Sequence, residues 1–195
     1  MEIRSFGENA APKLLDERTI EGYAIVFERE SRVMYDFEKK RFFIEIIKAG
    51  AISDELIRNC DVKALLEHDN QRLLARSNNG IGSLSLCIDD YGCMYRFLSP
   101  NTYEGDYAIE MVRRGDLYGS SFAYITDEKK NVEYSKRDGL LIRIVNKIDK
   151  IFDVSIVSDP AYFGTDVTVR SLEKHLQPVS KDDYKIKIEK LRIQI

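Results

Sequence analysis

The chain has 195 residues and a formal net charge of -3 at pH 7, with 44% hydrophobic and 32% charged residues. This length and composition are typical of one folded globular domain with a short extension. A net charge near zero argues against a nucleic-acid partner, which usually requires a basic domain. The sequence has no apolar run of about 18 residues, and its first residues lack the apolar core of a signal peptide. We therefore expect no membrane partner and a cytoplasmic location.

The first half of the chain consists of apolar strands joined by polar connections. Residues 1–17 are polar and predict a flexible N-terminal segment. Strands are predicted over TIEGYAIVF (19–27), RFFIEIIKAGAIS (41–53) and DVKALLEHD (61–69), and a short helix, DELIRN (54–59), is capped by Ser53. The polar stretch 70–80 is interpreted as a loop.

The second half predicts two hairpins and one longer helix. The turns of the hairpins are Asp90-Tyr91-Gly92 and Arg137-Asp138-Gly139. A helix is predicted over 102–114, ended by Gly115, and strands are predicted over 120–126 and 149–162. About eight strands with two or three helices indicate an α+β fold, arranged as a barrel or an open sandwich. The residues from 171 to 195 are densely charged and predict a C-terminal extension that packs on a partner or on a second copy.

The sequence indicates neither a metal site nor a cofactor site. A structural zinc site needs four closely spaced ligands, and the three cysteines and two histidines are scattered. Neither of the glycine-rich phosphate-binding motifs is present. The cysteines lack a C-x-x-C spacing and are interpreted as reduced thiols. We therefore expect no cofactor and no metal.

Nucleophilic catalysis by a serine needs a base, usually histidine, and a third group that orients it. Only His68 and His175 are available. His68 ends an apolar strand next to a loop and is the better candidate, whereas His175 lies in the charged extension; a purely structural role for His68 stays open. Spacing alone selects no serine, because the members of a catalytic triad converge from distant parts of a chain.

Three segments together resemble the prohead proteases of tailed bacteriophages, which mature the capsid. The first is GAISDELIRNCDVKALLEHD (50–69), which ends in a His-Asp pair. The second is MVRRGDLYGSSFAYI (111–125), similar to the segment that carries the family's nucleophile. The third is IFDVSIVSDPAY (151–162), similar to a block in which an acid precedes Val-Ser. The resemblance spans about residues 18–170, which we take as the protease domain.

The resemblance implies a role for three residues. His68 aligns with the base, Ser121 with the nucleophile and Asp153 with the acid that orients the base, a position usually held by glutamate. Ser120 is then a neighbour of the nucleophile. In an alternating strand Ser121 faces outward, on the side opposite to Phe122 and Tyr124. The implied fold is α+β: a small, mostly antiparallel β-barrel with surrounding helices, as in the herpesvirus assemblins.

The implied function is that of a serine endopeptidase. Such a protease would cleave scaffold and capsid proteins as well as its own chain. Cleavage would take place inside the assembling phage prohead, in the cytoplasm of a bacterial host. A homo-oligomer is also expected. The alternative is a catalytically inactive scaffold or assembly module with the same fold. Candidate groups for stabilising the oxyanion are Arg76, Arg113 and Arg114, which can equally be surface arginines. An unrelated esterase is disfavoured, because the sequence contains no G-x-S-x-G elbow.

Overall fold

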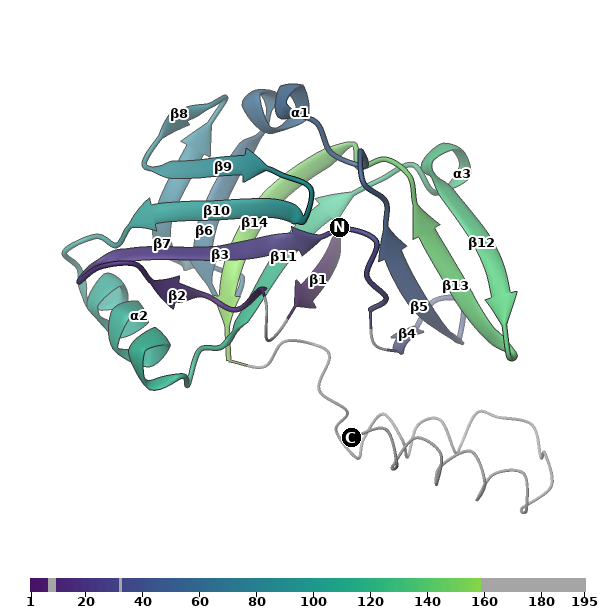
Figure 1. Cartoon of the computed structure of the whole chain (residues 1–195), viewed down its shortest axis with the longest axis horizontal. Coiled ribbons are helices and arrows are strands. Elements are labelled where there is room, and N and C mark those ends of the chain that lie inside the picture. The colour runs from purple at the N-terminus through teal and green to yellow at the C-terminus, as the bar shows by residue number, and fades with distance from the viewer. Residues whose placement is uncertain (7–9, 32, 159–195) are drawn as a thin grey trace, which may run out of the picture. The chain divides into compact units, whose positions relative to one another are not determined.

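The computed structural model describes residues 1–6, 10–31 and 33–158, and the largest sheet of this part of the chain has six strands (Figure 1). In spatial order they are β1 (Glu2–Phe6), β11 (Gly119–Ile125), β14 (Lys150–Val157), β6 (Asp61–Leu66), β7 (Asp69–Asn78) and β8 (Ile81–Gly82). Strands β14 and β6 are parallel, and the other neighbours are antiparallel. The sheet thus places β14 at its middle, between β11 and β6.

Two four-stranded sheets accompany the first. One has the order β2 (Lys13–Leu14), β3 (Thr19–Val26), β10 (Gly92–Leu98) and β9 (Leu84–Ile88). The other has the order β12 (Val132–Arg137), β13 (Leu140–Val145), β5 (Arg41–Ile47) and β4 (Met34–Asp36), with β13 and β5 parallel. Both predicted hairpins are confirmed, because β9 pairs with β10 and β12 pairs with β13 in antiparallel register.

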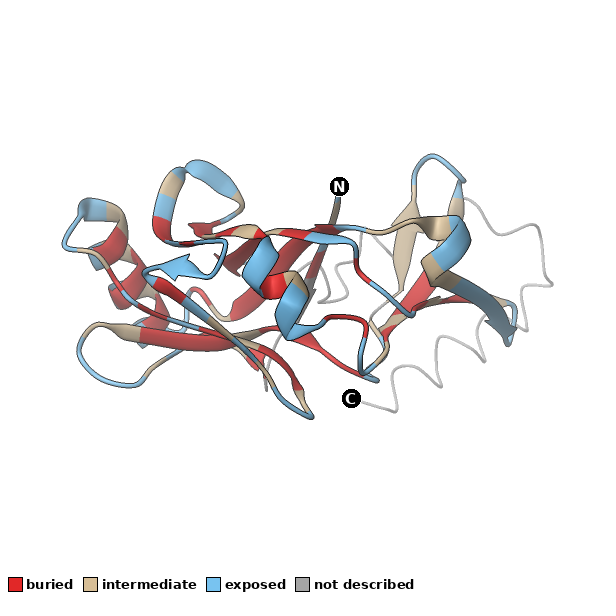
Figure 2. Ribbon diagram, turned by 90° about the horizontal axis from the view of Figure 1, so that it is seen from above, coloured by how far each residue is buried: buried red, intermediate tan, exposed pale blue. Residues whose placement is uncertain are grey.

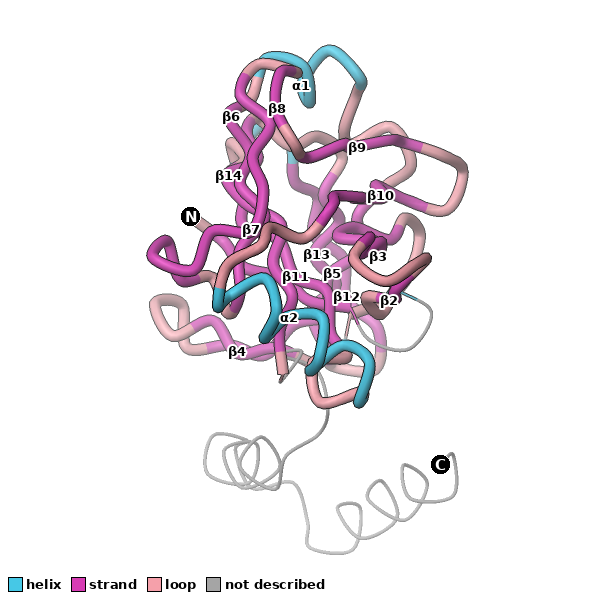
Figure 3. Tube along the Cα trace, turned by 90° about the vertical axis from the view of Figure 1, so that its left-hand side faces the viewer, coloured by secondary structure: helices cyan, strands magenta, loops and turns pink. Residues whose placement is uncertain are grey.

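Two predicted helix boundaries are confirmed, the start of one helix after Ser53 and the end of the other at Gly115. The hydroxyl of Ser53 accepts from the Leu56 amide at the start of α1 (Asp54–Asn59). Thr102 caps α2 (Tyr103–Arg114) in the same way, and Gly115 ends it in the left-handed conformation. Helix α2 packs near β2 and β7 (Figure 3), and α3 (Glu128–Asn131) is a single exposed turn. Among the helices described here, none is long and apolar enough to span a membrane.

The hydrophobic core lies between the six-stranded sheet and the sheet that contains β3 and β10. Most buried residues lie on strands, whereas the turns, parts of the helices and most of β12 are exposed (Figure 2). Phe122 and Tyr124 of β11 are fully buried, as is Tyr95 of β10. Gly22 of β3 allows this close approach, because a Cβ built there would lie 2.5 Å from the Tyr95 hydroxyl and 2.9 Å from Ser120 Oγ. The two sheets therefore meet next to the serine pair.

The predicted α+β barrel with surrounding helices is wrong. The described residues are mostly strand, their helices have six, twelve and four residues, and their sheets are open. The six-stranded sheet ends at β1 on one side and at β8 on the other, and these two strands do not pair. A barrel requires the first and last strands to pair, and that contact joins segments far apart in the chain. Local sequence patterns therefore could not decide whether the sheet closes into a barrel.

Two local predictions also differ from the structure. The predicted loop 70–80 is mostly strand β7, because the chain reverses at Glu67 and His68 in a turn that lacks the usual Asn-Gly signal. The segment predicted to be flexible, 1–17, holds strands β1 and β2. The extension from 171 to 195, including His175, lies outside the described residues.

Candidate active site

Three side chains from distant parts of the chain form one line of hydrogen bonds. The His68 ring lies between the other two: its Nδ1 is 2.6 Å from Asp153 Oδ1, and its Nε2 is 2.6 Å from Ser121 Oγ. The partners of His68 are 85 and 53 residues away in sequence. The structure therefore brings together all three residues that the family resemblance singles out.

The order of the strands explains this convergence. Ser121 lies on β11, directly opposite Ser155 of the central strand β14. Asp153 lies two residues earlier on β14, so it projects on the same face as Ser155. On the other side of β14, strand β6 pairs in parallel and leads into the turn that carries His68. The serine and the histidine thus approach the acid from opposite sides of its strand.

The His68 turn has an unusual backbone. Glu67 and His68 have φ values of 53° and 56°, the pattern of a two-residue type I′ hairpin turn, where Asn and Gly are favoured. The Glu67 amide donates to the Ile156 carbonyl at 3.0 Å, and Glu67 Oε1 accepts from the Ser158 amide at 2.7 Å. Both contacts tie the turn to the end of β14. Glu67 is therefore a positioning residue that the sequence patterns missed, since it carries no turn signal.

Ser155 is a second residue whose role the motifs did not reveal. Its hydroxyl donates to Asp153 Oδ1 at 2.8 Å and lies 3.2 Å from His68 Nδ1. Ser155 is 1% exposed, so water does not compete strongly for the carboxylate oxygen. The sequence did contain one signal for this role: residues two apart on a strand face the same side, as Asp153 and Ser155 do on β14.

The direction of these hydrogen bonds follows from the chemistry of the groups. An ionised carboxylate can only accept, so the contact with Asp153 places the ring proton on Nδ1. The His68 Nε2 is then the acceptor, and Ser121 Oγ can pass its proton to it. This is the arrangement in which a histidine acts as general base toward a serine nucleophile.

The surroundings of the two serines differ. Ser120 Oγ contacts the Tyr95 hydroxyl at 2.9 Å and donates to the Ala10 carbonyl at 2.7 Å, and in the described part of the chain it makes no hydrogen bond to His68. Burial raises the pKa of Tyr95 above its usual value, so this phenol stays neutral. Ser120 thus lies in the sheet interface, on the side of the core.

Ser121 was predicted to face outward, and its side chain is instead fully buried. It is flanked by β14 on one side and by β1 on the other, since Ser121 lies opposite Ser155 and opposite Ser5. Ser121 Oγ also contacts the Arg4 carbonyl oxygen at 2.9 Å. The N-terminal strand, which the sequence patterns did not predict, is the reason for the difference.

Comparison with known protein families identifies the chain. The model of the caudovirus prohead serine proteases matches residues 8–178. The chain belongs to this family. It is therefore a member of the serine proteases that act in capsid maturation of bacteriophages. Neither the curated proteins nor the solved structures include a significant match to it.

In this member of the prohead proteases, the candidate arginines form ion pairs on the surface. Arg76 pairs with Asp61, and Arg113 and Arg114 pair with carboxylates on or next to α2. All three side chains are about half exposed, which favours the alternative of surface arginines over a role at the oxyanion. Within the described ranges, no group of three or more His, Cys, Asp or Glu side chains is arranged to hold a metal ion.

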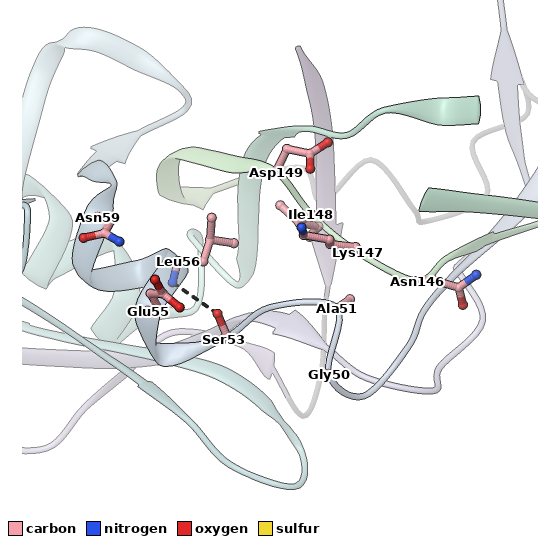
Figure 4. A pocket seen from close by; sticks show the side chains of 10 residues that line it. All are labelled: Gly50, Ala51, Ser53, Glu55, Leu56, Asn59, Asn146, Lys147, Ile148 and Asp149. Atoms are coloured by element: carbon pink, nitrogen blue, oxygen red, sulfur yellow. Dashed lines mark hydrogen bonds between the residues drawn. The ribbon is translucent and has the colours of Figure 1, made fainter. Parts of the chain in front are cut away.

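A pocket of about 490 Å³ is lined by residues that do not belong to this line of hydrogen bonds (Figure 4). Its walls come from the start of α1 and from the connection between β13 and β14, and include Ser53, Glu55, Lys147 and Asp149. None of the three aligned residues lines it. The candidate active site is therefore at the face of the six-stranded sheet and not in this pocket.

Proposed function

We propose that the chain is a serine endopeptidase that cleaves scaffold and capsid proteins, and itself, during prohead maturation. The observation that carries the proposal is the line of hydrogen bonds from Ser121 through His68 to Asp153 in a chain of this family. Cleavage takes place inside the assembling prohead, in the cytoplasm of the bacterial host. A homo-oligomer remains a prediction.

The proposed mechanism uses only these three side chains. Ser121 Oγ attacks the scissile carbonyl carbon while His68 Nε2 takes its proton. Asp153 holds the ring by its Nδ1–H and stabilises the imidazolium that forms. His68 then gives the proton to the leaving amine, which departs and leaves an acyl-Ser121. A water molecule, deprotonated by His68, attacks this ester, and the proton returns to Ser121 as the new carboxyl terminus leaves.

One observation favours a second function, that of an assembly module without catalysis. Ser121 is fully buried, and the Arg4 carbonyl occupies one side of its hydroxyl. A nucleophile that never becomes accessible cannot react. The two functions differ in whether Ser121 forms a covalent adduct with an active-site reagent.

The first prediction compares the two adjacent serines. We expect Ser121→Ala to lose labelling by a fluorophosphonate and to lower cleavage of co-expressed scaffold protein by about 10³-fold or more. Ser120→Ala serves as the matched control, because its hydroxyl bonds to Tyr95 and Ala10 and not to His68. We expect it to keep labelling and cleavage, at a stability cost of about 1–3 kcal/mol, because the buried Tyr95 hydroxyl and Ala10 carbonyl lose a partner.

Labelling is followed by intact-mass spectrometry and cleavage by gel electrophoresis of assembled proheads. Full cleavage by Ser121→Ala would show that the assignment is wrong. If the wild-type chain is neither labelled nor active, while Ser121→Ala still supports normal prohead assembly, the chain is an assembly module.

A further inference from the structure

Strand β1 covers the edge of β11 beside Ser121, the edge with which an extended peptide could pair in its place. It is the last strand of the six-stranded sheet and pairs antiparallel with β11, with Arg4 opposite Phe122 and Ser5 opposite Ser121. The carbonyl oxygen of Arg4 is 2.9 Å from Ser121 Oγ. A backbone carbonyl of the chain itself is thus next to the candidate nucleophile.

This contact is incompatible with attack on a second carbonyl at the same place. A reacting carbonyl must come within about 3–3.5 Å of the nucleophile, and the Arg4 carbonyl already fills that position. The Ser121 hydroxyl has one hydrogen, and His68 Nε2 and the Arg4 oxygen both accept it. With β1 in place, the Arg4 carbonyl therefore competes with His68 for the hydrogen of the Ser121 hydroxyl. Departure of β1 would free the edge of β11, and the Ser121 hydroxyl could then donate its hydrogen bond to His68 alone.

Side chains of β1 are held by a cluster of charges on the side of the strand that faces away from Ser121. Arg4 makes two hydrogen bonds to Glu45 of β5, at 2.7 and 3.0 Å, and Glu2 accepts from Arg143 of β13 at 2.8 Å. Glu45 and Arg143 also bond to each other, and the Tyr124 hydroxyl donates to Glu45 at 3.1 Å. Burial and the Glu45 charge raise the pKa of Tyr124, so it remains a donor.

The charges in this cluster specify what can replace β1. Glu45 and Arg143 are buried, with side chains 2% and 6% exposed, and they neutralise each other. Strand β1 adds one acid and one base, each next to a partner of opposite sign. A peptide with the same two charges keeps every buried charge paired. A peptide with the charges exchanged would place like charges together, which is costly in a buried site.

We propose that β1 is an internal occupant of the substrate site: the edge of β11 binds an extended peptide in antiparallel register, with a basic residue at the position of Arg4 and an acidic residue two positions before it. Binding requires β1 to leave. The chain is therefore held inactive by its own N-terminal strand until a substrate strand replaces it. The cleavage that follows rests on the proposed peptidase function, whereas the exchange of strands does not.

The first test loosens β1 in the full-length chain. Glu2→Gln with Arg4→Gln removes both charges of β1 and leaves Glu45 paired with Arg143. We expect fluorophosphonate labelling of Ser121 to become about tenfold faster or more, because removing buried ion pairs weakens the attachment of the strand. The matched control is Glu30→Gln with Arg137→Gln, which removes an ion pair in which both side chains are more than 40% exposed and should leave the rate unchanged. If both chains are labelled, and at the same rate, with both folded by circular dichroism, the proposal is overturned.

The second test measures binding without catalysis, in the loosened variant that also carries Ser121→Ala. Three fluorescein-labelled peptides are compared by fluorescence anisotropy: one with the sequence of residues 1–6, one with its glutamate and arginine exchanged, and one with glutamine at both positions. We expect the first to bind about tenfold or more tightly than the exchanged peptide, and the neutral one to lie between them. Equal binding by all three, or no binding by any, contradicts the proposed site.

The two tests separate this proposal from the proposed function. If the peptide of residues 1–6 binds selectively but neither chain is labelled, the strand site stands and the peptidase function fails. If labelling of the wild type is already fast and the loosened variant is no faster, the peptidase function stands and the internal occupant is wrong.

Discussion

Asp153 accepts two hydrogen bonds on a single carboxylate oxygen, from the His68 ring and from the Ser155 hydroxyl. The first holds the imidazole, and the second fixes the carboxylate in the orientation that the imidazole needs. Aspartate is shorter than the glutamate usual in the family, yet it lies 2.6 Å from the ring. The buried Ser155 is the group that can hold so short a side chain in place, because a bond to it leaves the carboxylate few other orientations.

At the scale of single residues we predict that Ser155→Ala slows cleavage about tenfold without affecting substrate binding, because Asp153 loses its second donor. Asp153→Asn should be worse, by about 10³–10⁴-fold, because the ring then has the wrong tautomer for accepting a proton. The measurement is kcat and KM for a scaffold-derived peptide. Ser155→Thr keeps the hydroxyl and should retain part of the rate, and Ser85→Ala on the exposed side of β9 is the control. A purely structural role for Ser155 would change stability and leave kcat unaltered.

The element that positions the base is the β6–β7 hairpin. Its two turn residues have positive φ, and neither is glycine or asparagine. Non-glycine residues in this region cost about 1–2 kcal/mol each, so the surrounding structure must hold them. The bonds from Glu67 to the end of β14 supply that hold. Strain is thus stored next to the candidate base, where a precise ring position is needed.

At this scale we compare two substitutions at Glu67, both of which lose the carboxylate bond to the Ser158 amide. Asparagine tolerates positive φ, whereas valine is β-branched and does not. We expect Glu67→Val to be less stable than Glu67→Asn by about 1–2 kcal/mol. Urea unfolding, followed by far-UV circular dichroism because the chain has no tryptophan, gives the difference in the free energy of unfolding. Equal stabilities would mean that the turn changes conformation in the variants and that its φ values are not essential.

At the scale of the whole described domain, the two sheets that form the core meet at Gly22, Tyr95 and Ser120. A side chain at position 22 would overlap Tyr95 and press on Ser120. Because Ser120 directly precedes Ser121, the packing of the core and the position of the candidate nucleophile are mechanically connected. Interiors are packed densely enough that a single added methyl group is felt by its neighbours.

We therefore predict that Gly22→Ala lowers the free energy of unfolding by about 1–3 kcal/mol and slows labelling of Ser121. Tyr95→Phe removes the hydroxyl oxygen nearest to the added methyl, and by itself should cost about 1 kcal/mol for the lost bond to Ser120. The double variant should lose less than the sum of the two single losses, because the steric overlap is partly relieved. Strict additivity in urea unfolding would mean that the sheets move apart and that the contact with Tyr95 is not the cause.

The sequence by itself determined the features that depend on neighbouring residues. Ser53 placed the start of one helix, Gly115 placed the end of the other, and the Asp138-Gly139 turn placed a hairpin, because these signals act within a few residues. The resemblance of three segments was enough to single out His68, Ser121 and Asp153. These residues come from separate segments, so no local pattern could measure the distances between them.

Only the tertiary structure decided that the sheets stay open, that β1 joins the edge of β11, and that Ser121 is buried beneath the Arg4 carbonyl. Each of these depends on pairing between segments far apart in the chain. Strand β1 is short and polar, and it is held in place by Glu45 and Arg143. These partners lie 41 and 141 residues away in the sequence. The sequence of residues 1–17 therefore does not reveal the interactions that stabilise β1.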